Sequence, residues 1–308
     1  MSDFQIGLLS NVGMISFVAL SAYLLLISGS ISFGQQAYFG IGAYAAGIAT
    51  ALWGWPLGVG LGFGALMGGL GGGLIGLLTR RLGGVYFAIA TLAFAEFVRV
   101  ALDLWRYQRT IGGELLGPDG PNGFNGIRRA FEDGWHPLSF MILIWTLLGA
   151  TLLALMLLDR TRSGLALRGT GEDPVLATLL GTDVTRLRVS VATAAGAIAG
   201  LGGGLYAHLN TYIEPRLFDV MLGVHALAYG LIGGLGTALG PLIGVLTDIG
   251  ILESSRLFQG WRMVVFGGLV ALLLIWRPRG LLDEAAVGRL RRRARRLRRA
   301  ILPAARHA

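Results

Sequence analysis

The sequence predicts an all-α integral membrane protein, a polytopic bundle of about nine (eight to ten) transmembrane helices, some of them interrupted. Of its 308 residues, 54% are apolar and 14% are charged, against about 25% charged residues in a typical soluble domain. The apolar residues form long continuous runs of the length that a membrane helix needs. A soluble domain, a collagen and a disordered chain are therefore all excluded.

The predicted spans follow one another along most of the chain. Two of them, 220–236 and 239–255, are interrupted by Gly and Pro, and the last is short, so the number of spans ranges from eight to ten. The nine segments are 6–27, 36–53, 57–79, 85–102, 138–158, 189–208, 220–236, 239–255 and 262–276.

The positive charge is concentrated at the C-terminus. Residues 277–308 hold 11 Arg and two acids, which accounts for the whole net charge of +9. We interpret 281–308 as a cytoplasmic tail that touches anionic lipid. Nucleic-acid binding is the weaker alternative, because the Arg run follows directly on an apolar span.

The distribution of Arg also predicts the orientation of the transmembrane domain, residues 1–280. With the tail inside, 18 Arg fall on the inner side of the membrane and seven on the outer side, as the positive-inside rule requires. The two long connections are then an outer loop at 103–137 and an inner loop at 159–188.

Two residue types are missing, and both absences restrict the chemistry. The chain has no Cys, and all 26 basic residues are Arg. Without Lys there is no Walker A loop to hold nucleotide phosphates. We therefore expect no enzyme, no metal site and no cofactor in this chain, and ATP and Mg²⁺ to be used by partner subunits if hydrolysis drives it.

Glycines recur every fourth residue in the third predicted span. This spacing places them on one helical face, where small residues let another backbone approach closely. Ala192, Gly196, Gly200 and Gly204 repeat the pattern in the sixth span. The partner surface lies either within the chain or on another subunit. The glycines of the third span are Gly60, Gly64, Gly68, Gly72 and Gly76.

The inner loop contains the signals of one short helix. Asp173 can cap it, Pro174 suits its first position and Gly181 can end it. A helix of about two turns is unstable alone in water, so its apolar side chains need a surface, either the membrane domain or a cytoplasmic partner. These side chains are Val175, Leu176, Leu179 and Leu180.

Five stretches carry a resemblance to a known family. They read ISFGQQAYFGIGAYAAGIAT (31–50), GVYFAIATLAFAE (84–96), SGLALRGTGEDPVLATLLGTDV (163–184), AGLGGGLYAHL (199–209) and YGLIGGLGTALGPLIG (229–244). Together they resemble permeases of branched-chain amino acid ABC transporters of the LivM/LivH type, and the second stretch with the long outer loop favours LivM.

The resemblance implies the partners and the coupling element. Such a permease pairs with a homologous permease, docks two ABC ATPases and receives solute from a soluble binding protein. Gly164, Glu172, Asp173 and Gly181 match the family's coupling loop. The chain departs from that loop at Leu165, where a basic residue is usual, and at Gly169 and Gly171, where a continuous helix is commoner.

Polar residues within the spans are the candidates for a solute pathway. Gln35, Gln36 and Tyr38 lie near an interrupted segment, which suits a pathway, although the glutamines can instead cap helices or bond across them. His225 and Asp248 are further candidates, and Asp248 has no evident local partner. His208 is expected at the membrane interface.

Glu96 and Arg99 are three residues apart in the fourth predicted span. That spacing allows them to pair on one face of the helix. We interpret them as a structural ion pair, with a proton relay as the alternative.

The favoured function is the permease subunit of an ATP-driven importer of branched-chain or related small amino acids in the bacterial inner membrane. The same architecture importing urea, short amides or aromatic acids is one alternative. An ion-coupled secondary transporter is another, for which Asp248 and the Glu96–Arg99 pair are the available sites.

Overall fold

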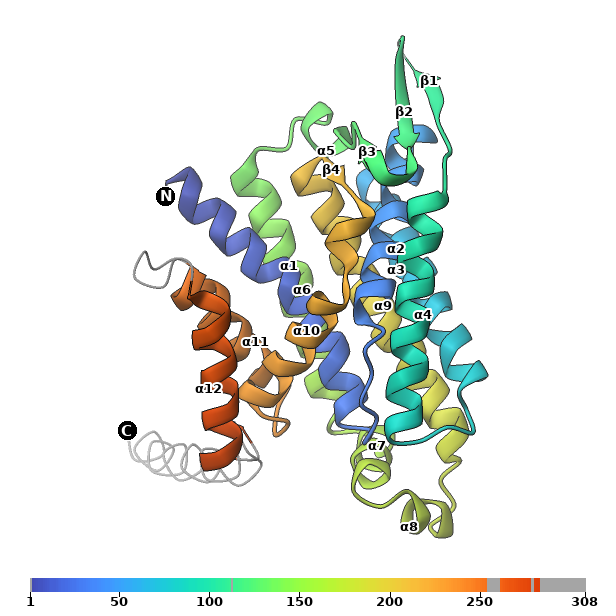
Figure 1. Ribbon diagram of the computed structural model, residues 1–308, viewed down its shortest axis with the longest axis vertical. Helices are drawn as coiled ribbons and strands as arrows, with labels where there is room; N and C mark the ends of the chain where they lie inside the picture. The colour runs from blue at the N-terminus through green and yellow to red at the C-terminus, as the bar shows by residue number, and fades with distance from the viewer. Residues whose placement is uncertain (1, 112, 254–260, 278–279, 283–308) are drawn as a thin grey trace, which may run out of the picture.

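The computed structural model describes residues 2–111, 113–253, 261–277 and 280–282. The predicted tail therefore lies almost wholly outside the described residues. Within them the chain is mostly helical, and five helices are long and apolar enough to cross a membrane. The protein is thus a multi-pass membrane protein (Figure 1). The five are α1 (Asp3–Leu26), α3 (Leu57–Leu78), α4 (Val85–Leu104), α6 (Pro137–Leu158) and α9 (Val184–Asn210).

The other predicted spans are helical but shorter or irregular. α2 and α11 each continue into a π-helical segment, Ile48–Leu52 and Leu246–Glu253 respectively. α10 has 14 residues, which is about 21 Å of helix against about 30 Å of hydrocarbon. The prediction that α10 continues to residue 236 is wrong, because Gly234 takes a positive φ of 89°. The bounds are α2 (Gln35–Gly47), α10 (Val220–Gly233), α11 (Gly240–Val245) and α12 (Arg262–Trp276).

The glycine pattern joins α3 to α9 inside the chain. A Cβ added at Gly68 would lie 2.6 Å from the carbonyl oxygen of Gly196 and 2.8 Å from Cα of Gly200. Gly64 and Gly72 meet the same face of α9. The two backbones are therefore in direct contact, and α9 also packs against α1 and α2 at the centre of the bundle.

The outer loop holds a small sheet that the all-α prediction missed. Four antiparallel strands pair in the order β1-β2-β3-β4, and β4 comes from the segment after α9. The strands are short, and β4 is distant in sequence from the other three. Alternation of apolar and polar residues therefore did not indicate strands here. They are β1 (Arg109–Ile111), β2 (Glu114–Pro118), β3 (Phe124–Asn125) and β4 (Tyr212–Ile213), with α5 (Arg129–Glu132) following β3.

Tyr212 ties β4 to its surroundings. Its hydroxyl lies 3.2 Å from the Glu214 carboxylate and 3.3 Å from the carbonyl oxygen of Asn122, and either oxygen can accept its single proton. Desolvation and the Glu214 carboxylate raise the pKa of the Tyr212 phenol. The sheet is thereby fastened at the end of the bundle that carries the β1–β2 hairpin (Figure 1).

The inner loop forms two helices, α7 (Arg162–Glu172) and α8 (Pro174–Leu179), at the opposite end of the bundle (Figure 1). α12 also ends on that side. Glycines at 169 and 171 were expected to break the helix, but α7 runs through both of them. Its end is fixed instead by Asp173, whose φ of −147° and ψ of 100° are extended.

Candidate functional site

α8 forms where the sequence places it. The Asp173 carboxylate accepts hydrogen bonds from the backbone N–H groups of Val175 (2.9 Å) and Leu176 (3.0 Å). Pro174 occupies the first position, and Gly181 ends the turn with a φ of 87°. These contacts satisfy N–H groups that no helical carbonyl reaches. The short helix is thus defined by its caps.

The apolar side chains of α8 point away from the bundle. Val175 is 68% exposed, Leu176 54%, Leu179 79% and Leu180 78%, whereas Ala177 is buried. The membrane domain is therefore not the surface that covers them. Exposed apolar side chains gathered on and just after one short helix are typical of a surface that another molecule covers.

Removing the cap of α8 will loosen the helix. Asp173→Ala is expected to cost about 1 kcal/mol, the usual value for an N-cap. The measurement is hydrogen–deuterium exchange of residues 174–181, which should accelerate severalfold while exchange in α9 stays unchanged. Asp173→Ser retains an acceptor oxygen and should exchange like the wild type. Equal exchange in the Ala and Ser variants would contradict this role of the carboxylate.

α7 attaches α8 to the bundle through Arg168. The Arg168 guanidinium donates to the Asp159 carboxylate at 3.0 Å, to the hydroxyl of Tyr23 on α1 at 3.1 Å, and to the carbonyl oxygen of Leu235 at 3.1 Å. Leu235 lies in the connection between α10 and α11. One side chain therefore links the inner loop to two separate parts of the membrane domain.

The C-terminal end of α7 also touches the break between α1 and α2. A Cβ at Gly29, whose φ is 73°, would lie 2.9 Å from the carbonyl oxygen of Gly171. Gly171 itself packs on the carbonyl oxygen of Ile27. Residues 27–34 are not helical and lead directly into α2. Gly164, at the other end of α7, packs against the carbonyl of Leu158. Only small residues permit these approaches.

Gln35, Gln36 and Tyr38 lie in the core at the start of α2. All three are at most 1% exposed, and the side-chain amides of the two glutamines have no hydrogen-bond partner among the described residues. The Gln36 amide lies against Gly223 of α10. The glutamines thus neither cap a helix nor bond across helices here. Buried amides without partners are costly.

His225 and Asp248 come together around Tyr229. The Tyr229 hydroxyl donates to the Asp248 carboxylate at 2.7 Å, which supplies the local partner that the sequence did not reveal. The His225 ring stacks on Tyr229 with centroids 6.0 Å apart, and it contacts Phe266 of α12 at 5.2 Å. This cluster joins α10, the π-helix after α11, and α12.

Glu96 and Arg99 are in contact on α4. The Arg99 Nε lies 3.0 Å from both carboxylate oxygens of Glu96. The side chain of Glu96 is 46% exposed and that of Arg99 is 27% exposed. The pair is therefore open to the surroundings of the chain.

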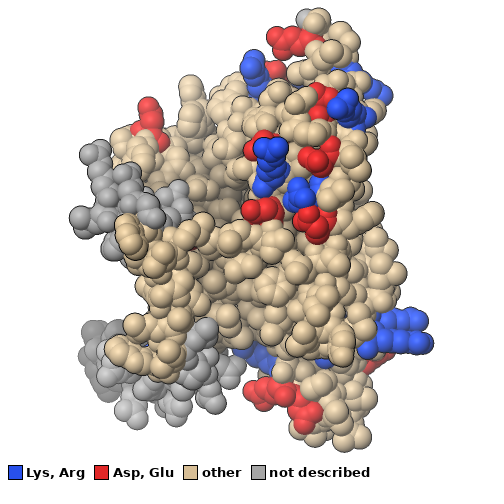
Figure 2. Space-filling view, viewed as in Figure 1, with Lys and Arg blue, Asp and Glu red and all other residues tan. Residues whose placement is uncertain are grey.

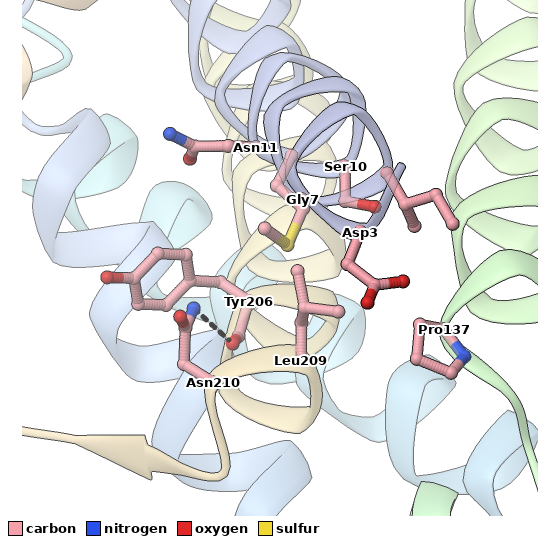
Figure 3. A pocket seen from close by; sticks show the side chains of 10 residues that line it. Asp3, Gly7, Ser10, Asn11, Pro137, Tyr206, Leu209 and Asn210 are labelled. Carbon is pink, nitrogen blue, oxygen red and sulfur yellow. Dashed lines mark hydrogen bonds between the residues drawn. The ribbon is translucent and has the colours of Figure 1, made fainter. Parts of the chain in front are cut away.

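Two further polar features lie near one end of the bundle. His208, two residues before the end of α9, is buried within the chain, and its ring nitrogens contact Thr50 Oγ1 at 2.9 Å and the Gly204 carbonyl at 2.7 Å. A cavity of about 510 Å³ also opens between α1, α6 and α9 (Figure 3). Ser10 and Asn11, polar residues in an apolar span, were its only sequence signal.

Comparison with known proteins identifies the family of this chain. A family model described as "Branched-chain amino acid transport system / permease component" matches residues 5–275. The chain is 29% identical over 284 residues to the LivM permease protein of the Escherichia coli K12 high-affinity branched-chain amino acid transport system, covering 83% of this chain and 64% of that protein. The chain thus spans about two thirds of the LivM length.

Other relatives match over shorter regions. The probable LivH permease of Methanocaldococcus jannaschii is 33% identical over 143 residues, or 45% of this chain and 43% of the relative. The BraD permease of Pseudomonas aeruginosa is 26% identical over 171 residues, or 54% of this chain and 53% of the relative. No solved structure matches the chain. Since the family match covers most of its residues, the chain belongs to the family of branched-chain amino acid transport system permease components.

Proposed function

We propose that this chain is the membrane-spanning permease subunit of an ATP-driven ABC importer for branched-chain or related small amino acids. The observation that carries the proposal is the exposed apolar face of α8, which α7 connects to the membrane domain. A chain without Lys has no Walker A loop. In this proposal an external ATPase supplies the energy, and α8 offers it a docking point.

The proposed assembly contains two permeases, two ATPases and a soluble binding protein. Similarity to both LivM and LivH proteins supports a pair of homologous permeases. ATP and Mg²⁺ belong to the ATPases. The permease lies in the bacterial inner membrane with nine membrane segments, four of them short or irregular, and with its C-terminus cytoplasmic. The 18 Arg on the inner side support this orientation.

The break before α2 is the proposed moving part of the solute route. Gln35 and Gln36 bury side-chain amides that find no partner among the described residues. Such atoms are satisfied once a polar solute or water reaches them. We assign the present arrangement to a closed route, in which α7 holds the break from below.

The docking role of α8 is tested by two matched substitutions. Leu179→Glu places a charge on the exposed apolar face, and the ATPases should no longer copurify with the permease. Leu115→Glu makes the same change at a side chain that is 66% exposed in the outer hairpin, and it should leave copurification intact. Retained ATPase binding by the Leu179→Glu permease would refute docking at α8.

The transport function is tested by uptake of labelled leucine and labelled urea with the ATPases present or withheld. We expect leucine uptake that requires the ATPases and ATP. Urea uptake instead would assign the chain to the related class of importers. Uptake that survives ATP depletion in a proton gradient would indicate an ion-coupled transporter.

A further inference from the structure

One face of α4, a helix long and apolar enough to cross a membrane, carries charges within its length. Glu96, Arg99 and Asp103 follow at spacings of three and four residues, so they share one helical face. Measured from Val85 at about 1.5 Å per residue, Glu96 lies about 16 Å and Arg99 about 21 Å along the helix. Both positions fall within a hydrocarbon core of about 30 Å.

A second row of charges lies beside this face. Arg216 and Asp219 belong to the segment around the 3₁₀-helix Pro215–Phe218, which packs against α4. Both are exposed. Figure 2 shows acidic and basic side chains gathered below the hairpin, above a belt without charges. We call Glu96, Arg99, Asp103, Arg216 and Asp219 the charged face.

Lipid is not a suitable neighbour for the charged face. Each charge at a helix centre costs about 2.5 to 3.5 kcal/mol on insertion scales. The other exposed helices obey this rule, since neither Leu57–Leu78 nor Pro137–Leu158 contains a charged residue. Charges within spans usually face water-filled cavities and mark solute routes.

The charged face is connected to the buried glutamines. Asp219 caps α10 by accepting the N–H of Leu222 at 3.2 Å. The adjacent residue, Gly223, lies against the Gln36 amide, whose nitrogen and oxygen have no partner among the described residues. The first turn of α10 thus has charges on one side and unpaired amide groups on the other.

We propose that the charged face lines the aqueous part of the solute route and holds the zwitterionic end of an amino acid. Arg99 would bind the α-carboxylate with its planar guanidinium. Glu96, Asp103 and Asp219 would attract the ammonium group, and exchange of the Glu96–Arg99 contact for solute contacts would keep every charge paired. This inference rests on the proposed function and assigns residues to its solute.

The chain contains no Cys, so single cysteines test the proposal without a background reaction. Leu92 lies one turn from Glu96 on the same face, and Leu92→Cys leaves every charge in place. Phe97 is 70% exposed on another face of α4, and Ala101, one turn further on that face, is also exposed. The assembled transporter in proteoliposomes is treated with a charged, membrane-impermeant methanethiosulfonate reagent.

We expect Leu92→Cys and Arg99→Cys to react at least tenfold faster than Phe97→Cys and Ala101→Cys. Leucine delivered by the binding protein should slow the reaction at Leu92→Cys, whereas 4-methylpentanoate, which lacks the amine, should not. Equal rates at all four positions, or no reaction at Leu92→Cys and Arg99→Cys, would overturn the proposal. The second result would assign the face to a contact between permeases.

Failure of this inference differs from failure of the proposed function. Labelling without ATP or solute reports only whether the face is wet, whatever drives transport. Uptake that does not depend on the ATPases would refute the importer and leave the labelling pattern intact. Labelling at Leu92→Cys that leucine does not slow would refute the zwitterion site, while ATP-driven leucine uptake could persist.

Discussion

Gly68→Leu will destroy the fold of the membrane domain. A Cβ at this position would lie 2.6 Å from the Gly196 carbonyl oxygen and 2.8 Å from Gly200 Cα. These are backbone atoms of α9, which cannot rotate away as a side chain can. Overpacking a core usually costs about 1 to 3 kcal/mol, and a leucine here has to separate two whole helices. We expect loss of the monodisperse peak in fluorescence-detected size exclusion.

Gly62→Leu is the matched control for this change. It lies on the same helix, and no atom of the described chain lies within 4 Å of its Cβ position. It should therefore fold like the wild type, and it is compared with Gly68→Leu at the same expression level. A monodisperse, thermally normal Gly68→Leu protein would show that α3 and α9 are not in backbone contact.

Arg168→Ala is expected to lower uptake at least tenfold while ATPase binding and ATP hydrolysis persist. The substitution leaves the exposed face of α8 unchanged but removes the hydrogen bonds to Asp159, Tyr23 and Leu235. Movement of α8 then no longer reaches α1 or the connection before α11. Uptake and ATP hydrolysis are measured in the same proteoliposomes. Lost uptake with normal hydrolysis means that movement of α8 no longer reaches the membrane domain, whereas loss of both means that the ATPases no longer dock.

The stability of the Arg168→Ala protein has to be measured alongside its uptake. Breaking a buried ion pair costs about 3 to 5 kcal/mol of stability. The side chains of Arg168 and Asp159 are 21% and 16% exposed. The free energy of unfolding should therefore fall by an amount at the lower end of that range. Arg186→Ala removes an ion pair of 2.9 Å whose arginine is 89% exposed, and it should change neither uptake nor melting temperature. Normal uptake by Arg168→Ala would contradict the role of α7.

The sequence predicts the helical elements because their signals are local. Apolar runs locate the membrane helices, and Asp173, Pro174 and Gly181 define the short helix without reference to the rest of the chain. The recurrence of glycine at every fourth residue identifies the packing face of α3 from the sequence alone. Whether α9 or another subunit covered it depended on tertiary contacts, although the matching pattern on α9 pointed in the observed direction.

The remaining features depend on residues distant in sequence. β3 pairs with β4, so neither has an alternation long enough to recognise. Asp248 finds Tyr229 across the α10–α11 turn, and Arg168 reaches residues on two other elements. α7 was obscured because glycines 169 and 171 disfavour a helix locally, although close packing against residues 27–29 requires a small residue at position 171. Tertiary packing overrides propensity at such positions.

The central claim is that this chain forms the route for the solute but cannot by itself supply the energy for accumulation. The most direct measurement is leucine accumulation in proteoliposomes that contain either this chain alone or the chain with its partner permease, both ATPases, the binding protein and ATP. Accumulation against a gradient is predicted only in the complete system, and it should disappear with Leu179→Glu. Concentrative uptake by the chain alone would contradict the claim.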